Sequence, residues 1–249
     1  MLRSAKDLNG YVLKATDDEI GRCKDFLFDD EEWTVRYMVA DTGKWLPGRK
    51  VLISPISLGE PDWTSRVFPI TLNKEQVENA PSLSEDAPVS RQYEARWFKY
   101  YRYPYYWGGD GLWGPGVEPA GLAAGERGFA ETVEEEDLGD SHLRSVDEVA
   151  GYHIQATDGE IGHVEDFILD DLNWTLRYVV VDTRNWLPGR KVLVAPVWVD
   201  SVDWAKEKAI VDLTREDVKN SPEYDPAAPV NREYEARLYD FYGRPKYWK

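Results

Sequence analysis

Histidine is the first side chain to consider for chemistry, because its imidazole titrates near neutral pH and is the commonest metal ligand. The chain has three, His142, His153 and His163. If the segments on either side of Asp158-Gly159 pair as a hairpin, His153 and His163 lie close together on adjacent strands. No third ligand is indicated beside them. The pattern therefore favours two surface histidines over a metal site, and no cofactor is predicted.

Two pairs of consecutive aspartates are the next candidates. Asp29-Asp30 and Asp170-Asp171 would supply either a catalytic carboxylate pair or ligands for a divalent cation. Consecutive side chains of a strand point to opposite faces, however, and aspartate is frequent in turns. The spacing of an EF-hand loop is absent. We therefore expect turns here, and a divalent-metal-binding protein or hydrolase built on these carboxylate-rich turns is an alternative.

A basic pair also occurs twice, as Arg49-Lys50 and Arg190-Lys191, each time directly after a glycine. A phosphate-binding loop would need Walker spacing around it, which the sequence lacks. We expect a solvated strand end at both places. Cys23 is the only cysteine, and we expect it to be a small buried residue and not a nucleophile. Together these residues predict a protein without enzymatic activity.

The densest aromatic segments lie near the end of each half of the chain. After the N-cap candidates Ser90 and Asn231, aromatic and apolar residues recur at i, i+4 and i+7/8, which predicts two amphipathic helices. Such a helix face either packs on its own domain or forms an interface, where Tyr and Trp are enriched. The predicted interface residues are Trp97, Tyr100, Tyr101, Tyr106, Trp107, Leu238, Phe241, Tyr242, Tyr247 and Trp248.

The net charge of −16 is concentrated in one segment. Residues 108–142 contain nine acidic residues and one basic residue, whereas residues 1–107 contain 17 acidic and 15 basic residues. Without a basic patch, we expect no binding to nucleic acid or anionic lipid. No run approaches the roughly 18 apolar residues that span a bilayer, and the N-terminus lacks the apolar core of a secretory signal. We therefore expect a cytoplasmic protein that is not inserted in a membrane.

The chain contains one sequence twice, at a constant offset of 141 residues. Residues 45–52 recur unchanged as residues 186–193, and about half of the 106 aligned pairs are identical without a gap. A period of this size predicts a tandem domain duplication and not a solenoid. The predicted domains are 1–107 and 143–249. The acidic, glycine-rich segment 108–142 between them has the composition of a flexible linker that does not fold by itself.

Short strands separated by turn residues are predicted over most of each copy. In copy two they cover 152–156, 160–169, 174–182, 191–197 and 209–213, with equivalents in copy one. Strands of this length at intervals of roughly 8–12 residues are typical of a small barrel or sandwich. Asn73 and Thr214 are predicted to cap a brief helix after the last strand of each copy.

A series of motifs follows in the same order in both copies. In copy two it runs from Asp-Gly-Glu-Ile-Gly at 158–162, through an Asp-Phe strand and Tyr-Val-Val-Val-Asp-Thr at 178–183, to Gly-Arg-Lys-Val-Leu-Val-Ala-Pro at 189–196. This order resembles the PRC-barrel family, named for the cytoplasmic domain of the photosynthetic reaction-centre H subunit, which also includes a domain of a ribosome-maturation factor. The resemblance covers 157–196 and 16–55. It implies a small β-barrel used as a docking or assembly surface, with no catalytic residues.

Together these observations predict a mainly β protein of two tandem PRC-like barrels, each with short helices and a C-terminal aromatic helix, packed as a pseudo-twofold pair. Linking two copies of a self-associating domain raises their effective concentration. The expected partners are the second copy in the same chain, an unidentified protein and further chains in a homo-oligomer. The predicted function is a non-enzymatic interaction or assembly module. The alternative is a peripheral component of a photosynthetic or other membrane electron-transfer complex.

Overall fold

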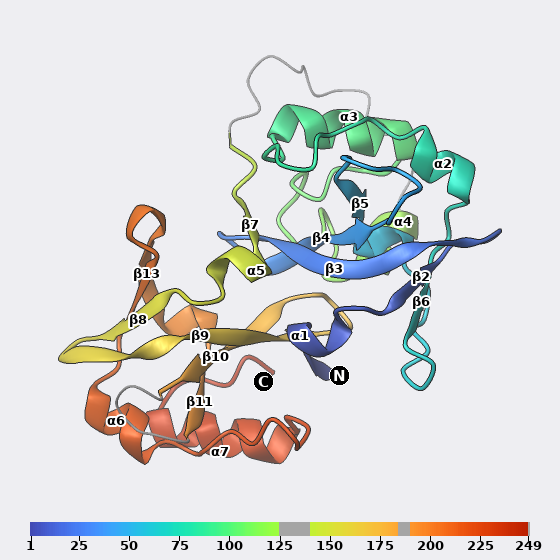
Figure 1. The fold of residues 1–249 in the computed structure, drawn as a ribbon. Helices are drawn as coiled ribbons and strands as arrows, with labels where there is room; N and C mark the ends of the chain where they lie inside the picture. Colours follow the sequence, from blue (N-terminus) through green and yellow to red (C-terminus); the bar gives the residue numbers. More distant parts are fainter. Residues whose placement is uncertain (125–139, 184–189, 249) are drawn as a thin grey trace. The chain divides into compact units, whose positions relative to one another are not determined.

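The computed structural model describes residues 1–124, 140–183 and 190–248, and the chain divides into two compact units (Figure 1). The copy-one unit consists of Leu8–Ser145 and Leu172–Thr175, and the copy-two unit of Met1–Asp7, Val146–Asp171 and Leu176–Lys249. Both units are mainly β, as the sequence predicts.

One mixed sheet forms the copy-one unit. The strand order is β5-β4-β3-β2-β6, with β7 also paired to β3; β2 and β6 are parallel and the other pairs are antiparallel. Among the described residues this order does not return on itself. The strands are β2 (Val12–Lys14), β3 (Glu19–Asp29), β4 (Thr34–Asp41), β5 (Val51–Ile53), β6 (Val67–Pro69) and β7 (Leu143–Ser145).

Short helices cover this sheet and carry the predicted caps. The helices are the 3-10 turn η1 (Pro55–Ser57), α2 (Lys74–Glu78), α3 (Arg91–Tyr101) and α4 (Pro119–Ala124), while α1 (Ala5–Leu8) crosses from one unit to the other. The Asn73 side chain accepts the N–H of Gln76 at the start of α2, and Ser90 accepts the N–H of Tyr93 at the start of α3. Figure 1 shows α3 lying across the β3–β4–β5 part of the sheet.

The copy-two unit repeats this plan. Its order is β11-β10-β9-β8-β13-β12, with β1 also paired to β9 and with β8 and β13 parallel. The strands are β1 (Leu2–Ser4), β8 (His153–Ala156), β9 (Gly159–Asp170), β10 (Leu176–Asp182), β11 (Lys191–Val194), β12 (Val199–Asp203) and β13 (Lys208–Val211). The helices are α5 (Val146–Val149), η3 (Pro196–Trp198), η4 (Trp204–Lys206), α6 (Arg215–Asn220) and α7 (Arg232–Tyr242). Thr214 and Asn231 cap α6 and α7, as predicted.

One glycine of the repeated motif is required by the approach of two backbones. Gly162 in β9 has φ +142, and a Cβ there would lie 2.1 Å from the carbonyl oxygen of Asp182. Gly21 in β3 has the same φ and the same 2.1 Å approach to Asp41. No side chain fits so close to a backbone oxygen, so glycine allows the long central strand to pack against its neighbour in both copies.

The first strand of each copy belongs to the other copy's sheet. Leu2–Ser4 (β1) pairs with the end of β9 in the copy-two unit, and Leu143–Ser145 (β7) pairs with the end of β3 in the copy-one unit. The anchoring contacts are equivalent, because Ser4 Oγ donates to Asp166 at 2.5 Å and Ser145 Oγ donates to Asp25 at 2.6 Å. The units therefore contain exchanged segments, and their limits differ from the predicted boundaries 1–107 and 143–249.

The turn between β9 and β10 also belongs to the other unit, because Leu172–Thr175 is part of the copy-one unit, whereas the equivalent residues 31–34 stay in that same unit. Trp174 is 5% exposed there, with its ring 6.3 Å from that of Phe26 and 6.2 Å from that of Phe68. Its carbonyl accepts the N–H of Val35 at 2.8 Å. A tryptophan from copy two therefore completes the core of the copy-one unit.

Part of the predicted linker is folded. Residues 111–116 form two isolated β-bridges, α4 follows, and Trp113 and Leu122 are 0% and 1% exposed in the copy-one unit. A Cβ at Gly109 would lie 2.6 Å from the backbone of Gly114, so the tight loop depends on its glycines. The average composition of residues 108–142 does not indicate this folded part, because two large apolar residues are enough to anchor a short segment on an existing core. Residues 125–139 lie outside the described part of the chain.

Candidate functional site

A buried carboxylate lies at the centre of the copy-one unit. Glu94 on α3 has no exposed surface. Its Oε1 accepts hydrogen bonds from the hydroxyls of Tyr37 on β4 and Tyr106 after the helix, each at 2.9 Å. Its Oε2 accepts one from Arg91 Nη1 at 2.8 Å. These four residues, the copy-one cluster, connect the sheet, the helix and the segment that follows the helix.

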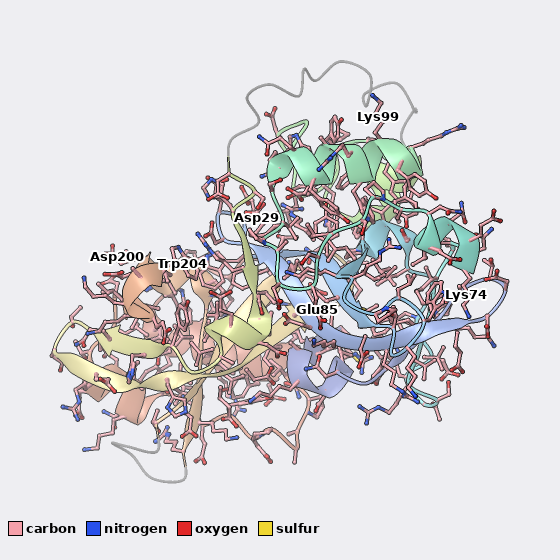
Figure 2. All side chains as sticks on the ribbon, turned by 45° about the horizontal axis from the view of Figure 1, so that its top comes forward. Asp29, Lys74, Glu85, Lys99, Asp200 and Trp204 are labelled. Atoms are coloured by element: carbon pink, nitrogen blue, oxygen red, sulfur yellow. The ribbon has the colours of Figure 1, made fainter. Side chains whose placement is uncertain are left out.

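Helical spacing explains why the cluster assembles. Arg91 and Glu94 are three residues apart, so both side chains lie on the face of α3 that covers the sheet. Trp97 and Phe98 extend the same face and are buried, whereas Lys99 is on the outward side of the helix (Figure 2).

Burial controls the protonation of the cluster. Desolvation raises the pKa of Glu94 from its ordinary 4.5 to about 7, although Arg91 and the two phenol donors oppose this change. Burial and the nearby Glu94 charge also raise the pKa of Tyr37 and of Tyr106, so both phenols stay protonated and donate. With three donors and no exposed surface, the Glu94 carboxyl joins α3 to the sheet and to the segment after the helix.

An arginine forms a second layer around the cluster. The Arg36 guanidinium lies 4.1 Å from the ring centroid of Tyr106 and 5.0 Å from that of Trp113. Its Nη2 is 3.2 Å from the Asp29 carboxylate, and Nη1 donates to the carbonyl of Leu112. Arg36 is 2% exposed, so it anchors the folded part of residues 108–124 to the sheet.

The copy-two unit has an equivalent but more open cluster. Glu235 accepts from Tyr178 at 2.8 Å and from Tyr247 at 2.7 Å, and it pairs with Arg232 at 3.0 Å. The Arg232 side chain is 56% exposed, whereas the Arg91 side chain is 8% exposed. Arg91 differs in also donating to the carbonyl of Ser141, at 3.2 Å, from the segment that precedes β7.

The predicted interface residues divide by exposure. Trp97, Tyr106 and Leu238 are buried within their own units, where Trp97 packs against Tyr37 with ring centroids 5.3 Å apart. Tyr100 and Phe241 are 38% and 42% exposed. The remaining members are partly exposed, namely Tyr101, Trp107, Tyr242, Tyr247 and Trp248. Packing on the parent unit, one of the two expected roles, therefore accounts for the buried members, and a role between proteins stays a prediction for the exposed ones.

His153 and His163 lie on adjacent strands, as predicted. His153 and His163 are register partners on β8 and β9. His153 Nδ1 lies 3.1 Å from Glu160, and His163 Nε2 lies 4.0 Å from Asp182. In the described ranges, no three or more His, Cys, Asp or Glu side chains are grouped to hold a metal ion.

The acidic pairs hold the exchanged strands. Asp29 Oδ1 accepts the N–H groups of the turn residues Glu31 and Glu32, as expected for a turn. Asp30 pairs with Arg144 at 2.7 Å, next to β7. In copy two, Asp171 pairs with Arg3 at 3.3 Å and with the amino group of Met1. Each doublet is bound to backbone and basic groups, and the alternative of a carboxylate pair stays a prediction.

The repeated basic pairs lie at the starts of β5 and β11. Arg49 donates to the carbonyls of Glu78 at 2.8 Å and Ala80 at 3.1 Å, and Arg190 donates to those of Lys219 and Ser221. Both pairs lie at the start of a strand with partial exposure, as expected, and their arginines also satisfy carbonyls at the ends of α2 and α6, a role that was not predicted. The sequence feature that could have indicated this role is their position in a loop that is identical in the two copies. Most of the second loop, residues 184–189, lies outside the described part.

Other features that sequence reasoning missed are Glu94, Glu235 and Arg36. Each is a charged residue within a segment predicted to be amphipathic or β, and its burial depends on partners more than 50 residues away. Cys23 is 2% exposed, as predicted.

Comparisons with known proteins supply no family for this chain. No protein-family model matches it, and no curated protein is significantly similar to it. None of the described helices has both the length and the apolar character needed to cross a membrane.

Proposed function

We propose that the protein is a non-enzymatic interaction or assembly module of the cytoplasm, built from two PRC-barrel-like domains that form an intramolecular pair. The proposal rests on one observation, namely which groups the polar residues of the protein bind. The buried carboxylates and the acidic doublets are bound by structural partners, whereas Tyr100 and Phe241 place aromatic surface in solvent. Exposed aromatic groups on helices are typical anchors of protein interfaces.

The exchange of β1 and β7 supports the paired arrangement. Each copy supplies its Leu-Arg-Ser strand to the sheet of the other, with matching Ser–Asp contacts. Reciprocal exchange of identical elements is a common route by which two copies of a domain associate. A lone Cys23 is consistent with a reducing compartment.

An affinity capture with matched variants tests the proposal. Full-length protein carrying Phe241→Ser is compared with wild type and with Glu233→Ser, an exposed polar position on the same helix. We expect one or more proteins to be retained by wild type and Glu233→Ser and lost with Phe241→Ser. Capture that is unchanged in Phe241→Ser and in Tyr100→Ser, or turnover of a substrate by purified protein, would contradict the proposal.

A further inference from the structure

Two equivalent residues differ sharply in exposure. Ile56 in η1 and Val197 in η3 are 141 residues apart and occupy the same place in the two copies. Ile56 is 6% exposed, whereas Val197 is 81% exposed and is the most exposed large apolar residue in the described part of the chain. In the copy-one unit α4 packs against η1, the turn that contains Ile56.

The segment that covers copy one is anchored by three kinds of contact. Trp113 is buried beside Arg36 and donates its indole N–H to the carbonyl of Asn173 at 2.9 Å. The N–H of Gly114 binds the carbonyl of Tyr106 at 2.7 Å. Leu122 on α4 then provides the apolar side chain that is buried near the end of the segment.

The copy-two unit has the arginine and aromatic parts of this receptor, whereas the equivalent of Asn173, Glu32, belongs to the copy-one unit. Arg177 is equivalent to Arg36, and its guanidinium lies over the Tyr247 ring at 4.1 Å, the same distance that separates Arg36 from Tyr106. Tyr247 and Trp248 are only partly buried, and Val197 is open to solvent beside Trp198. Among the described residues of this unit, no segment takes the place that 111–122 has in copy one.

We infer that this copy-two receptor surface, formed by Arg177, Val197, Tyr247 and Trp248, binds a peptide segment of a partner protein with the chemistry of residues 111–122. That chemistry is a tryptophan flanked by glycine, with a backbone carbonyl for the arginine, followed by a leucine on a short helical turn. The preformed Arg177–Tyr247 stack supports this occupant, because in copy one the same stack borders the buried tryptophan. The inference rests on the proposed function and specifies one partner class for it.

A synthetic peptide with the sequence of residues 108–124 tests the inference against the full chain. We expect saturable binding of one peptide per chain, measured by fluorescence anisotropy of a labelled peptide. Val197→Asp, at a side chain already in solvent, is expected to weaken binding about tenfold or more, as is replacement of the peptide tryptophan by alanine. Ile210→Asp, at an exposed apolar position on β13 of the same unit, is the matched control and is expected to bind like wild type.

Three results would overturn the inference. The first is no binding of the peptide to the full chain. The second is equal binding to wild type and Val197→Asp, which would mean that the peptide replaces residues 108–124 in copy one. The third is self-association of the wild-type chain that Val197→Asp abolishes, which would make a second copy the occupant. If these occur while Phe241→Ser still loses its captured proteins, the proposed function stands and only this inference fails.

Discussion

Replacing Glu94 by glutamine is expected to flatten the pH dependence of stability between pH 4.5 and about 7. In wild type, burial raises the pKa of this carboxyl from 4.5 in its ordinary state to about 7 in the fold. Within that window the folded protein holds a proton on Glu94 that the unfolded chain has released. The free energy of unfolding therefore falls as the pH rises, by about 1.4 kcal/mol per pH unit for this one group.

The total effect follows from the width of the window. About 2.5 pH units correspond to roughly 3 kcal/mol, which is fully present below pH 4.5 and is lost as the pH rises through 7. Glutamine keeps a carbonyl acceptor for Tyr37 and Tyr106 and does not titrate, so this component disappears. Urea unfolding followed by circular dichroism at pH 5, 6, 7 and 8 measures the slope, read as the difference between wild type and variant because other groups also titrate.

Glu235→Gln is the matched control, since it places an amide in the same hydrogen-bond geometry in copy two. At pH 8 this variant measures how much the replacement of a carboxylate by an amide changes the free energy of unfolding. The reasoning is refuted if Glu94→Gln retains the wild-type slope between pH 5 and 7.

Three further substitutions have expected effects on the urea midpoint. Gly162→Ala is expected to destabilise the protein by about 2–4 kcal/mol, because its Cβ would lie 2.1 Å from the Asp182 oxygen at a φ of +142. Arg102→Gly is expected to stabilise it by about 0.5–1 kcal/mol, because Arg102 ends α3 at φ 59, where copy two has Gly243 at φ 61. Trp113→Ala is expected to cost about 3–5 kcal/mol, because its ring is fully buried.

Each of these has a distinct contradiction. If Gly162→Ala leaves the urea midpoint unchanged, the two strands are farther apart than the structure places them. If Arg102→Gly leaves the urea midpoint unchanged, the C-terminal end of α3 is frayed. Hydrogen exchange of the last turn of α3 measures this fraying. A neutral Trp113→Ala would restore the interpretation of residues 108–124 as a linker; Val117→Ala, at an exposed residue of the same segment, is its control.

Local chemistry explains what could be predicted. The Asp158-Gly159 hairpin, the caps at Asn73 and Ser90 and the pairing of His153 with His163 depend on residues close together in sequence. Short-range turn and cap preferences are strong enough to specify them. The copy-one cluster was not predicted, because Glu94 is brought to Tyr37 across 57 residues, and only packing decides that a glutamate on an amphipathic helix faces inward.

The sequence by itself determined the duplication, the strands and the helix caps, since equal sequences have equal local preferences. The sequence does not indicate whether the first strand of each copy pairs with the sheet of its own copy or with that of the other copy. Leu2-Arg3-Ser4 and Leu143-Arg144-Ser145 are identical, and Asp25 and Asp166 offer both the same partner, so local energies do not distinguish exchanged from unexchanged pairing. The tertiary structure of the whole chain therefore determines which pairing forms. The same tertiary structure places α4 against η1, where Ile56 is buried, and leaves Val197 in solvent, although the two residues occupy equivalent positions in the copies.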